Sequence, residues 1–217
     1  KEKGAYANLK QKGLTGNYRY EYFKAHQTPI NRSVKPTILY APSWQPKEQT
    51  HIFIREIETL ANLTEYELII KLHPNTLKLG DPYLLRTLLN IEVMPHITVL
   101  EHTPTIYPIL AATDLLIGDI SSIGYDYLAF DKPMIFIENR EKIHQSRQMP
   151  LYSCGKLISH QDLNKIGKII GEELDNRGVR FAKARQELYD YTFAKLEAGV
   201  DFKAWISGQA ANIVSHF

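Results

Sequence analysis

The sequence has 217 residues, of which 44% are hydrophobic and 23% charged, and its net charge is +2. A chain of this length and composition can build a sizeable core, which argues against intrinsic disorder and collagen-like repeats. A single cysteine, Cys154, excludes an intrachain disulfide scaffold, and no apolar run approaches the roughly 18 residues that a membrane-spanning helix needs.

The charge is unevenly distributed along the chain. Residues 1–35 contain eight Lys or Arg residues against two Glu, which leaves a net charge of −4 for the rest. A solvated basic flank is the simplest interpretation, and a surface for an anionic partner or an anionic membrane leaflet is the functional one. Nucleic acid is a poor candidate, because no basic stripe continues into the body and no nucleic-acid motif is present.

From residue 36 onward, short aliphatic runs alternate with amphipathic segments, which is typical of βα units around a parallel sheet. We expect strands at residues 37–41, 67–72, 97–100, 115–118 and 133–137, and a weaker one near 155–158. Helices are predicted at 53–63, at 82–90, from Pro104 onward and at 121–130. Beyond Ser159 the pattern is helical, with two apolar faces formed by Leu163, Ile166, Ile169 and Ile170 and by Phe181, Ala184, Leu188 and Tyr191. The sequence therefore predicts an α/β fold with a Rossmann-like parallel sheet flanked by helices and closed by C-terminal helices.

The loops that follow the strands contain the candidate binding residues, because ligands of open parallel sheets lie beyond the carboxyl ends of the strands. Four such loops cover residues 42–46, 73–75, 101–105 and 119–122. We expect them to face one crevice. Their candidate ligand-binding side chains are Ser43, Trp44, His73, Asn75, His102, Asp119, Ser121 and Ser122.

Two of these loops carry groups suited to phosphate. Ser121 and Ser122 stand where a helix begins, so they either bind phosphate or cap the helix. His73 precedes Pro74, which holds it extended and directs its ring out of the sheet edge. A structural histidine is the alternative interpretation.

Asp119 precedes the predicted helix 121–130 and Asp126 lies in its second turn. A carboxylate at either position could accept hydrogen bonds from ribose hydroxyls. The alternatives are capping for Asp119 and surface solvation for Asp126. Trp44 either stacks on a base or packs in its loop. The eight histidines show no metal-ligand spacing, and Gly-x-Gly-x-x-Gly and Gly-Lys-Ser/Thr phosphate loops are absent. No metal or cofactor is therefore expected.

The segments "ILYAPSW", "IIKLHP" and "ATDLLIGDISSIGYDYLAFDKPMIF" occur in that order. Together they resemble the carboxyl-terminal half of the CDP-glycerol glycerophosphotransferases, which prime and polymerise teichoic acids. The similarity covers roughly residues 13 to 140. Upstream, "GLTGNYRYEYF" resembles the family's Gly-x-x-Arg/Lys-x-Asp segment, with Arg19 inside it and Glu21 at or near the acidic position.

The resemblance implies the second, donor-binding half of a GT-B architecture. By the family's pattern His73 contacts the donor pyrophosphate, Ser121 and Ser122 bind phosphate, and Asp119 orders their loop. The implied reaction is attack by an acceptor hydroxyl on the β-phosphorus of CDP-glycerol, with CMP as the leaving group. The general base is expected from a histidine of an amino-terminal half, so we assign no base here and expect this chain to bind donor without transferring it.

The resemblance also suggests a division of the chain and its surroundings. We expect a basic segment at an inter-domain junction (1–35), a nucleotide-donor-binding domain (36–176) and C-terminal helices (177–217). The implied partners are the nucleotide donor, a polymeric or lipid-linked acceptor and the amino-terminal half of the same enzyme. The expected location is the bacterial cytoplasm, with peripheral contact at the inner face of the membrane.

The chain departs from the family's pattern at two places. Residues 138–156 replace a Tyr/Gly/Pro-rich stretch, which leaves the donor open, and Gly118 stands where the family often has Thr, a change expected to affect only the strand end. Two other functions remain open. One is a GT-B glycosyltransferase that uses a nucleotide sugar, and the other is a non-catalytic nucleotide-binding or interaction domain.

Overall fold

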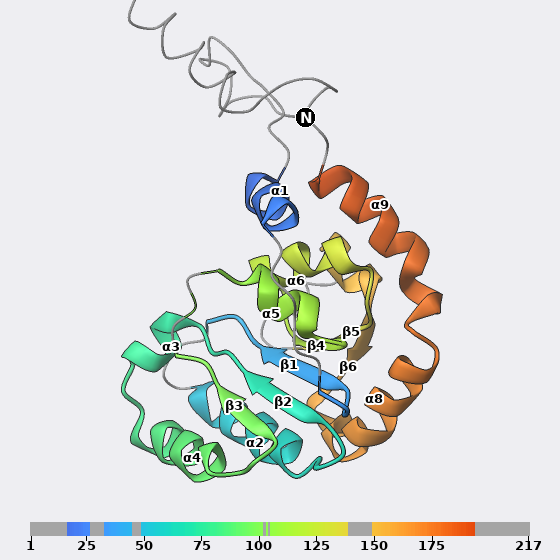
Figure 1. The fold of residues 1–217 in the computed structure, drawn as a ribbon. Helices are drawn as coiled ribbons and strands as arrows, with labels where there is room; N and C mark the ends of the chain where they lie inside the picture. The colour runs from blue at the N-terminus through green and yellow to red at the C-terminus, as the bar shows by residue number, and fades with distance from the viewer. Residues whose placement is uncertain are drawn as a thin grey trace, which may run out of the picture.

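The computed structural model describes residues 17–26, 33–44, 49–101, 103, 105–138 and 149–193. Within these ranges the strands form one six-stranded sheet in the order β3-β2-β1-β4-β5-β6, and every pair is parallel. Figure 1 shows this sheet between two layers of helices. The strands are β1 (Thr37–Ala41), β2 (Glu67–Ile70), β3 (Ile97–Val99), β4 (Leu115–Gly118), β5 (Met134–Ile137) and β6 (Lys156–Ile158). The predicted α/β, Rossmann-like fold is confirmed.

The sheet is buried on both faces, which explains why its strands read as continuous apolar runs. Along β1, Ile38 and Tyr40 belong to the hydrophobic core on one face, whereas Leu39 and Ala41 belong to the core on the other. The first core is covered by α2 (Thr50–Ala61), α4 (Pro82–Glu92), η5 (His160–Lys165) and α8 (Ile166–Asp175). The second is covered by α5 (Tyr107–Ala112), α6 (Ser122–Tyr127), η2 (Leu128–Phe130), η4 (Pro150–Cys154) and α9 (Ala182–Thr192).

The strand order reverses direction at the centre of the sheet, where β1 pairs with both β2 and β4. A crevice forms beyond the carboxyl ends of strands at such a switch point. At its floor Ala41 is paired with Gly118, and a Cβ atom placed on Gly118 would lie 2.7 Å from the Ala41 carbonyl oxygen. Gly118 therefore permits a close backbone approach that a side chain would obstruct.

Two α-helices of the described ranges were not predicted, and both border the crevice. The first is α1 (Tyr18–Ala25), which begins after Asn17, whose side chain accepts a hydrogen bond from the Tyr20 amide. Figure 1 shows it beside α5 and α6. Because α1 buries no residue, it lacks the apolar periodicity by which sequence patterns reveal helices. The second is α3 (Pro74–Lys78), a single turn that follows β2, and β2 ends at Ile70 instead of the predicted residue 72.

Other differences concern helix positions. The helix expected from Pro104 begins at Tyr107, with Pro108 in its first turn; Pro104 itself lies outside the described residues. On α9 the predicted apolar face is partly wrong. Tyr191, which was assigned to that face, is 83% exposed, whereas Arg185, which was not, is buried. The Arg185 guanidinium donates to Asp131 and to the Gly178 carbonyl, so this buried charge is paired. The last element of the described ranges before α9 is η6 (Val179–Phe181).

Candidate functional site

A crevice lies at the carboxyl edge of the sheet and consists of two adjoining lobes. The α1 lobe has a volume of about 460 Å³, and its walls come from α1, the loop before α5 and the start of α6. The Trp44 lobe has a volume of about 370 Å³ and is walled by the loops that follow β1 and β4. Both lobes are lined by the same five residues, which we call the junction: Lys71, His73, Pro74, Ser122 and Ile123.

His73 is held at the junction in a defined orientation. It occupies the cap position before α3 with an extended backbone, φ −64° and ψ 138°. Its Nδ1 accepts a hydrogen bond from the Asn75 amide at 3.1 Å, so in the neutral ring the proton resides on Nε2. Nε2–H is thus a donor available to a ligand. Asn75 contributes its backbone here, and its side chain lines neither lobe.

Ser121 and Ser122 also reach the crevice. Ser121 stands at the cap position of α6 and lines the Trp44 lobe, whereas Ser122 lines both lobes. The Ser121 side chain makes no capping hydrogen bond to α6. Its hydroxyl is therefore not used in the way that the capping interpretation requires.

Asp119 joins the two loops that wall the Trp44 lobe. Its carboxylate accepts a hydrogen bond from the Ser43 amide at 2.6 Å and another from the Ser43 hydroxyl. Trp44, the next residue, is 43% exposed and lines the lobe. Asp119 thus fixes the loop that presents Trp44.

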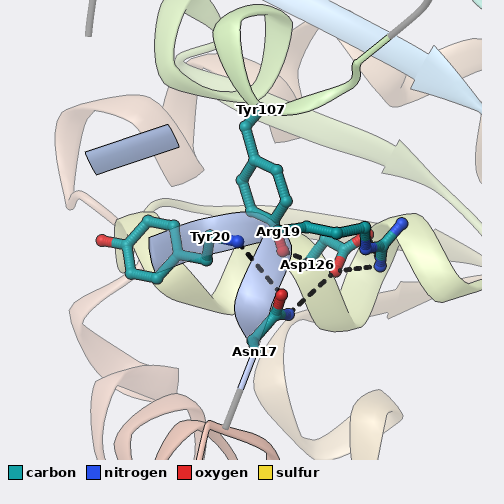
Figure 2. Close-up of polar contacts among 5 residues, drawn as sticks. All are labelled: Asn17, Arg19, Tyr20, Tyr107 and Asp126. Carbon is teal, nitrogen blue, oxygen red and sulfur yellow. Dashed lines mark hydrogen bonds and ion pairs between the residues drawn. The ribbon is translucent and has the colours of Figure 1, made fainter. Parts of the chain in front are cut away.

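Asp126 lies at the other end of the crevice, in the centre of a polar cluster that Figure 2 shows. Both of its carboxylate oxygens lie 2.9 Å from Nη2 of Arg19, and Oδ1 also accepts from Tyr107 at 2.8 Å and Asn17 at 3.3 Å. Asp126 is buried, so surface solvation is wrong. Its carboxylate instead attaches α1 to α5 and α6.

This attachment makes α1 a wall of the crevice. Arg19 uses only Nη2 in the contacts with Asp126, and its side chain is 64% exposed along the α1 lobe. Tyr18 and Tyr22 line the same lobe and are more than half exposed. Burial and the hydrogen bond to Asp126 raise the pKa of Tyr107, so its hydroxyl stays a donor throughout the physiological range.

Several crevice residues were missed at the sequence level. Lys71 lines both lobes, and Thr103 and Thr105 line the α1 lobe. Lys71 had a detectable signal, since a lysine interrupts an otherwise aliphatic strand end. The threonines lie in the loop 101–105 that was expected to face the crevice, but no periodicity singled them out within it. His102, which we expected in the same loop, lies outside the described residues.

A second buried polar network lies behind the Trp44 lobe. Glu56 of α2 accepts a hydrogen bond from the Tyr40 hydroxyl, and its other carboxylate oxygen lies 2.7 Å from Nε2 of His160. Burial, followed by the charge of Glu56, raises the pKa of Tyr40 well above its usual value. A cavity of about 20 Å³ separates this network from Asp119.

The described ranges of the chain contain neither a metal-ligand cluster nor a membrane-spanning helix. They contain no group of three or more His, Cys, Asp or Glu side chains that could hold a metal ion. They also contain no helix that is long and apolar enough to cross a membrane.

Comparison with known proteins gives a sequence relative and several solved structures with a similar fold. The chain is 26% identical over 140 residues to the teichoic acid glycerol-phosphate primase of Bacillus subtilis (strain 168), which covers 62% of this chain and 34% of the primase. Its fold resembles the wall teichoic acid polymerase TagF, with a TM-score of 0.60 at 18% identity over 92% of this chain and 47% of TagF. It also resembles Anabaena HepE in complex with UDP and glucose, with a TM-score of 0.51 at 13% identity over 84% and 49% of the two chains.

The chain thus spans about a third to a half of the length of these relatives. The structural similarities support the Rossmann-like fold that is shared by GT-B enzymes. The family model of CDP-glycerol:poly(glycerophosphate) glycerophosphotransferases matches residues 23–150, which include the strands and loops that form the Trp44 lobe and the junction. The chain belongs to the CDP-glycerol:poly(glycerophosphate) glycerophosphotransferase family.

Proposed function

We propose that this chain binds CDP-glycerol in the two-lobed crevice and supports transfer of glycerol phosphate to a hydroxyl group of a teichoic-acid-like polymer. The observation that carries the proposal is the junction. Lys71, His73 and Ser122 lie where the two lobes meet, so an elongated ligand that fills both lobes presents its centre to a cation and two hydrogen-bond donors. The centre of a nucleotide donor is its diphosphate.

The two lobes suit the two ends of such a donor. The α1 lobe offers exposed tyrosine rings, the threonine hydroxyls and the remaining N–H groups of Arg19, which are suited to a base and a ribose. The Trp44 lobe is the smaller one and places Ser43, Trp44 and Ser121 around the opposite end. Among the described residues, Asp126 is the one carboxylate that lines the α1 lobe, and a ribose hydroxyl would approach its Oδ2, to which Arg19 donates.

The chemistry requires that charge on the phosphates be neutralised. In the proposed reaction the acceptor oxygen forms a bond to the β-phosphorus, and the bond from that phosphorus to the bridging oxygen breaks. The electron pair remains with CMP, whose new negative charge would be stabilised by the preorganised donors of the junction. The proton of the acceptor hydroxyl must go to a base, and no described residue is assigned that role.

The proposal is tested by a calorimetric comparison of CDP-glycerol, CDP, UDP, UDP-glucose, ADP and NAD. Preferential binding of CDP-glycerol and CDP supports it, and equal or absent binding of all six contradicts it. A preference for UDP-glucose would instead support a nucleotide-sugar glycosyltransferase. In a second assay, CMP release from CDP-glycerol is followed with and without a lipid-linked acceptor.

The proposed partners extend to the membrane. Eight Lys or Arg residues within 1–35 support a peripheral contact with the anionic inner face of a bacterial membrane, where a lipid-linked acceptor would be held. Cosedimentation with vesicles that contain 30% anionic lipid, compared with neutral vesicles, tests this part of the proposal. Binding that is independent of lipid charge would contradict it.

A further inference from the structure

Among the described residues, Lys71 is a crevice cation without a protein partner for its ammonium group, in contrast to Arg19, which is paired with Asp126. Its backbone amide continues the ladder by donating to the Tyr40 carbonyl at 2.9 Å. The neighbours Ile70 and Leu72 are buried in the core beneath α2 and α4, so the alternation of side chains directs Lys71 toward the side of α5 and α6, which wall the α1 lobe. Among the described residues no hydrogen bond or ion pair of its ammonium group is recorded.

This arrangement is unfavourable for a lysine in the free protein. The side chain is half-buried, and burial lowers the pKa of Lys71. Lysines that lose hydration are normally paired with a carboxylate or a carbonyl, as Lys132 is with the carbonyls of Ala111 and Thr113. An ammonium group that is partly dehydrated and unpaired at the meeting point of two ligand lobes is suited to an anion supplied by the ligand.

We infer that Lys71 is the counter-ion of the donor's diphosphate, and that it stabilises the charge that develops on the leaving nucleotide. The inference rests on the proposed function and deepens it by naming the cation of the site. His73 and the serines donate neutral hydrogen bonds in this arrangement, whereas Lys71 supplies the positive charge. Arg19 is less suited to that role, because it lies in only one lobe and is paired with Asp126.

The inference predicts opposite effects of one substitution on ligand binding and on stability. In Lys71→Met the aliphatic stem is retained and the charge is lost, so CDP affinity should fall on the order of 10- to 100-fold while cytidine affinity changes less than about twofold. Because the unpaired charge is removed, the free Lys71→Met chain should melt at the same temperature as the parent or roughly 1–3 °C above it. Lys71→Arg should retain most of the CDP affinity, because it keeps the charge.

The test uses the 217-residue chain and three probes: CDP, cytidine and inorganic pyrophosphate. Lys78→Met is the matched control, because Lys78 is exposed in the last turn of α3 and lines neither lobe. If the parent binds CDP and Lys71→Met binds it equally well, the role of Lys71 is refuted while the proposed function stands. If the parent binds pyrophosphate through Lys71 but does not prefer CDP over UDP or ADP, the donor assignment fails and Lys71 stands as an anion site. Equal losses for CDP and cytidine, or a melting temperature several degrees lower in Lys71→Met, would make Lys71 a structural residue.

Discussion

Replacement of Asp126 by Ala tests how α1 is held as a wall of the crevice. The substitution leaves the Tyr107 hydroxyl without its acceptor, and Tyr107 is only 1% exposed. A buried hydroxyl without a partner costs about 1–3 kcal/mol. The ion pair with Arg19 adds up to about 1 kcal/mol, since the 64% exposed Arg19 side chain is screened by solvent. We therefore expect the free energy of unfolding to fall by about 1–4 kcal/mol.

The expected loss is also local, because α1 buries no residue of its own. Its other attachments include a hydrogen bond from the Tyr20 hydroxyl to the Ala129 carbonyl, and ring contacts of Tyr20 and Phe23 with Tyr107 and Phe130 and of Tyr20 with Phe193. Urea unfolding gives the global change, and hydrogen exchange of the α1 amides shows whether the helix detaches before the sheet unfolds.

Matched variants separate the contribution of the hydrogen bond from Tyr107 to Asp126 from that of the ion pair between Arg19 and Asp126. Asp126→Asn keeps an acceptor for Tyr107 and loses the charge, so it should cost only about 1 kcal/mol, and Tyr107→Phe should cost about 0.5–1.5 kcal/mol. An unfolding free energy of Asp126→Ala within about 0.5 kcal/mol of the parent, with unchanged exchange in α1, would refute the role of this cluster.

Four further predictions follow from the crevice and its supports. His73→Ala, and separately the double change Ser121→Ala with Ser122→Ala, should weaken CDP by about 10- to 100-fold and cytidine little; equal losses in calorimetry would assign them structural roles. Gly118→Thr should destabilise the chain by roughly 1–3 kcal/mol, because its Cβ would meet the Ala41 carbonyl oxygen; a stability equal to the parent in urea unfolding would contradict the close approach. Glu56→Ala should cost about 1–3 kcal/mol or more, because it leaves the Tyr40 hydroxyl buried without its acceptor, whereas Glu56→Gln should cost less; identical unfolding midpoints would contradict this. Since burial lowers the pKa of Lys71, CDP binding should weaken as pH rises through a value below that of free lysine, whereas Lys71→Arg should bind equally well across that range; parallel pH profiles would argue against a charged Lys71.

The sheet could be predicted from the sequence because its strands are buried on both faces. The predicted bounds of the strands at 37–41 and 115–118 agree with β1 and β4, in which every residue is buried. The rule that ligands lie beyond the carboxyl ends of strands then placed His73, Ser121 and Trp44 at one crevice.

The rest depends on contacts that local sequence does not encode. The Arg19–Asp126 pair joins residues 107 positions apart, and no periodicity marks either of them as partners. Helix α1 is held by aromatic rings and one carboxylate rather than by an apolar face, so the family resemblance singled out Arg19 there but periodicity predicted no helix. Lys71 could have been found, because a lysine between aliphatic residues at the end of the predicted strand 67–72 needs a reason to be there.

The central claim is that the junction of the two lobes binds the diphosphate of a nucleotide donor. A crystal structure of the chain with CDP-glycerol tests it most directly. We predict that the diphosphate lies within hydrogen-bond distance of the Lys71 ammonium, the His73 Nε2 and the hydroxyl of Ser121 or Ser122, with one end of the ligand in each lobe. Density for the ligand outside the crevice, or a diphosphate that contacts none of these groups, would contradict the claim.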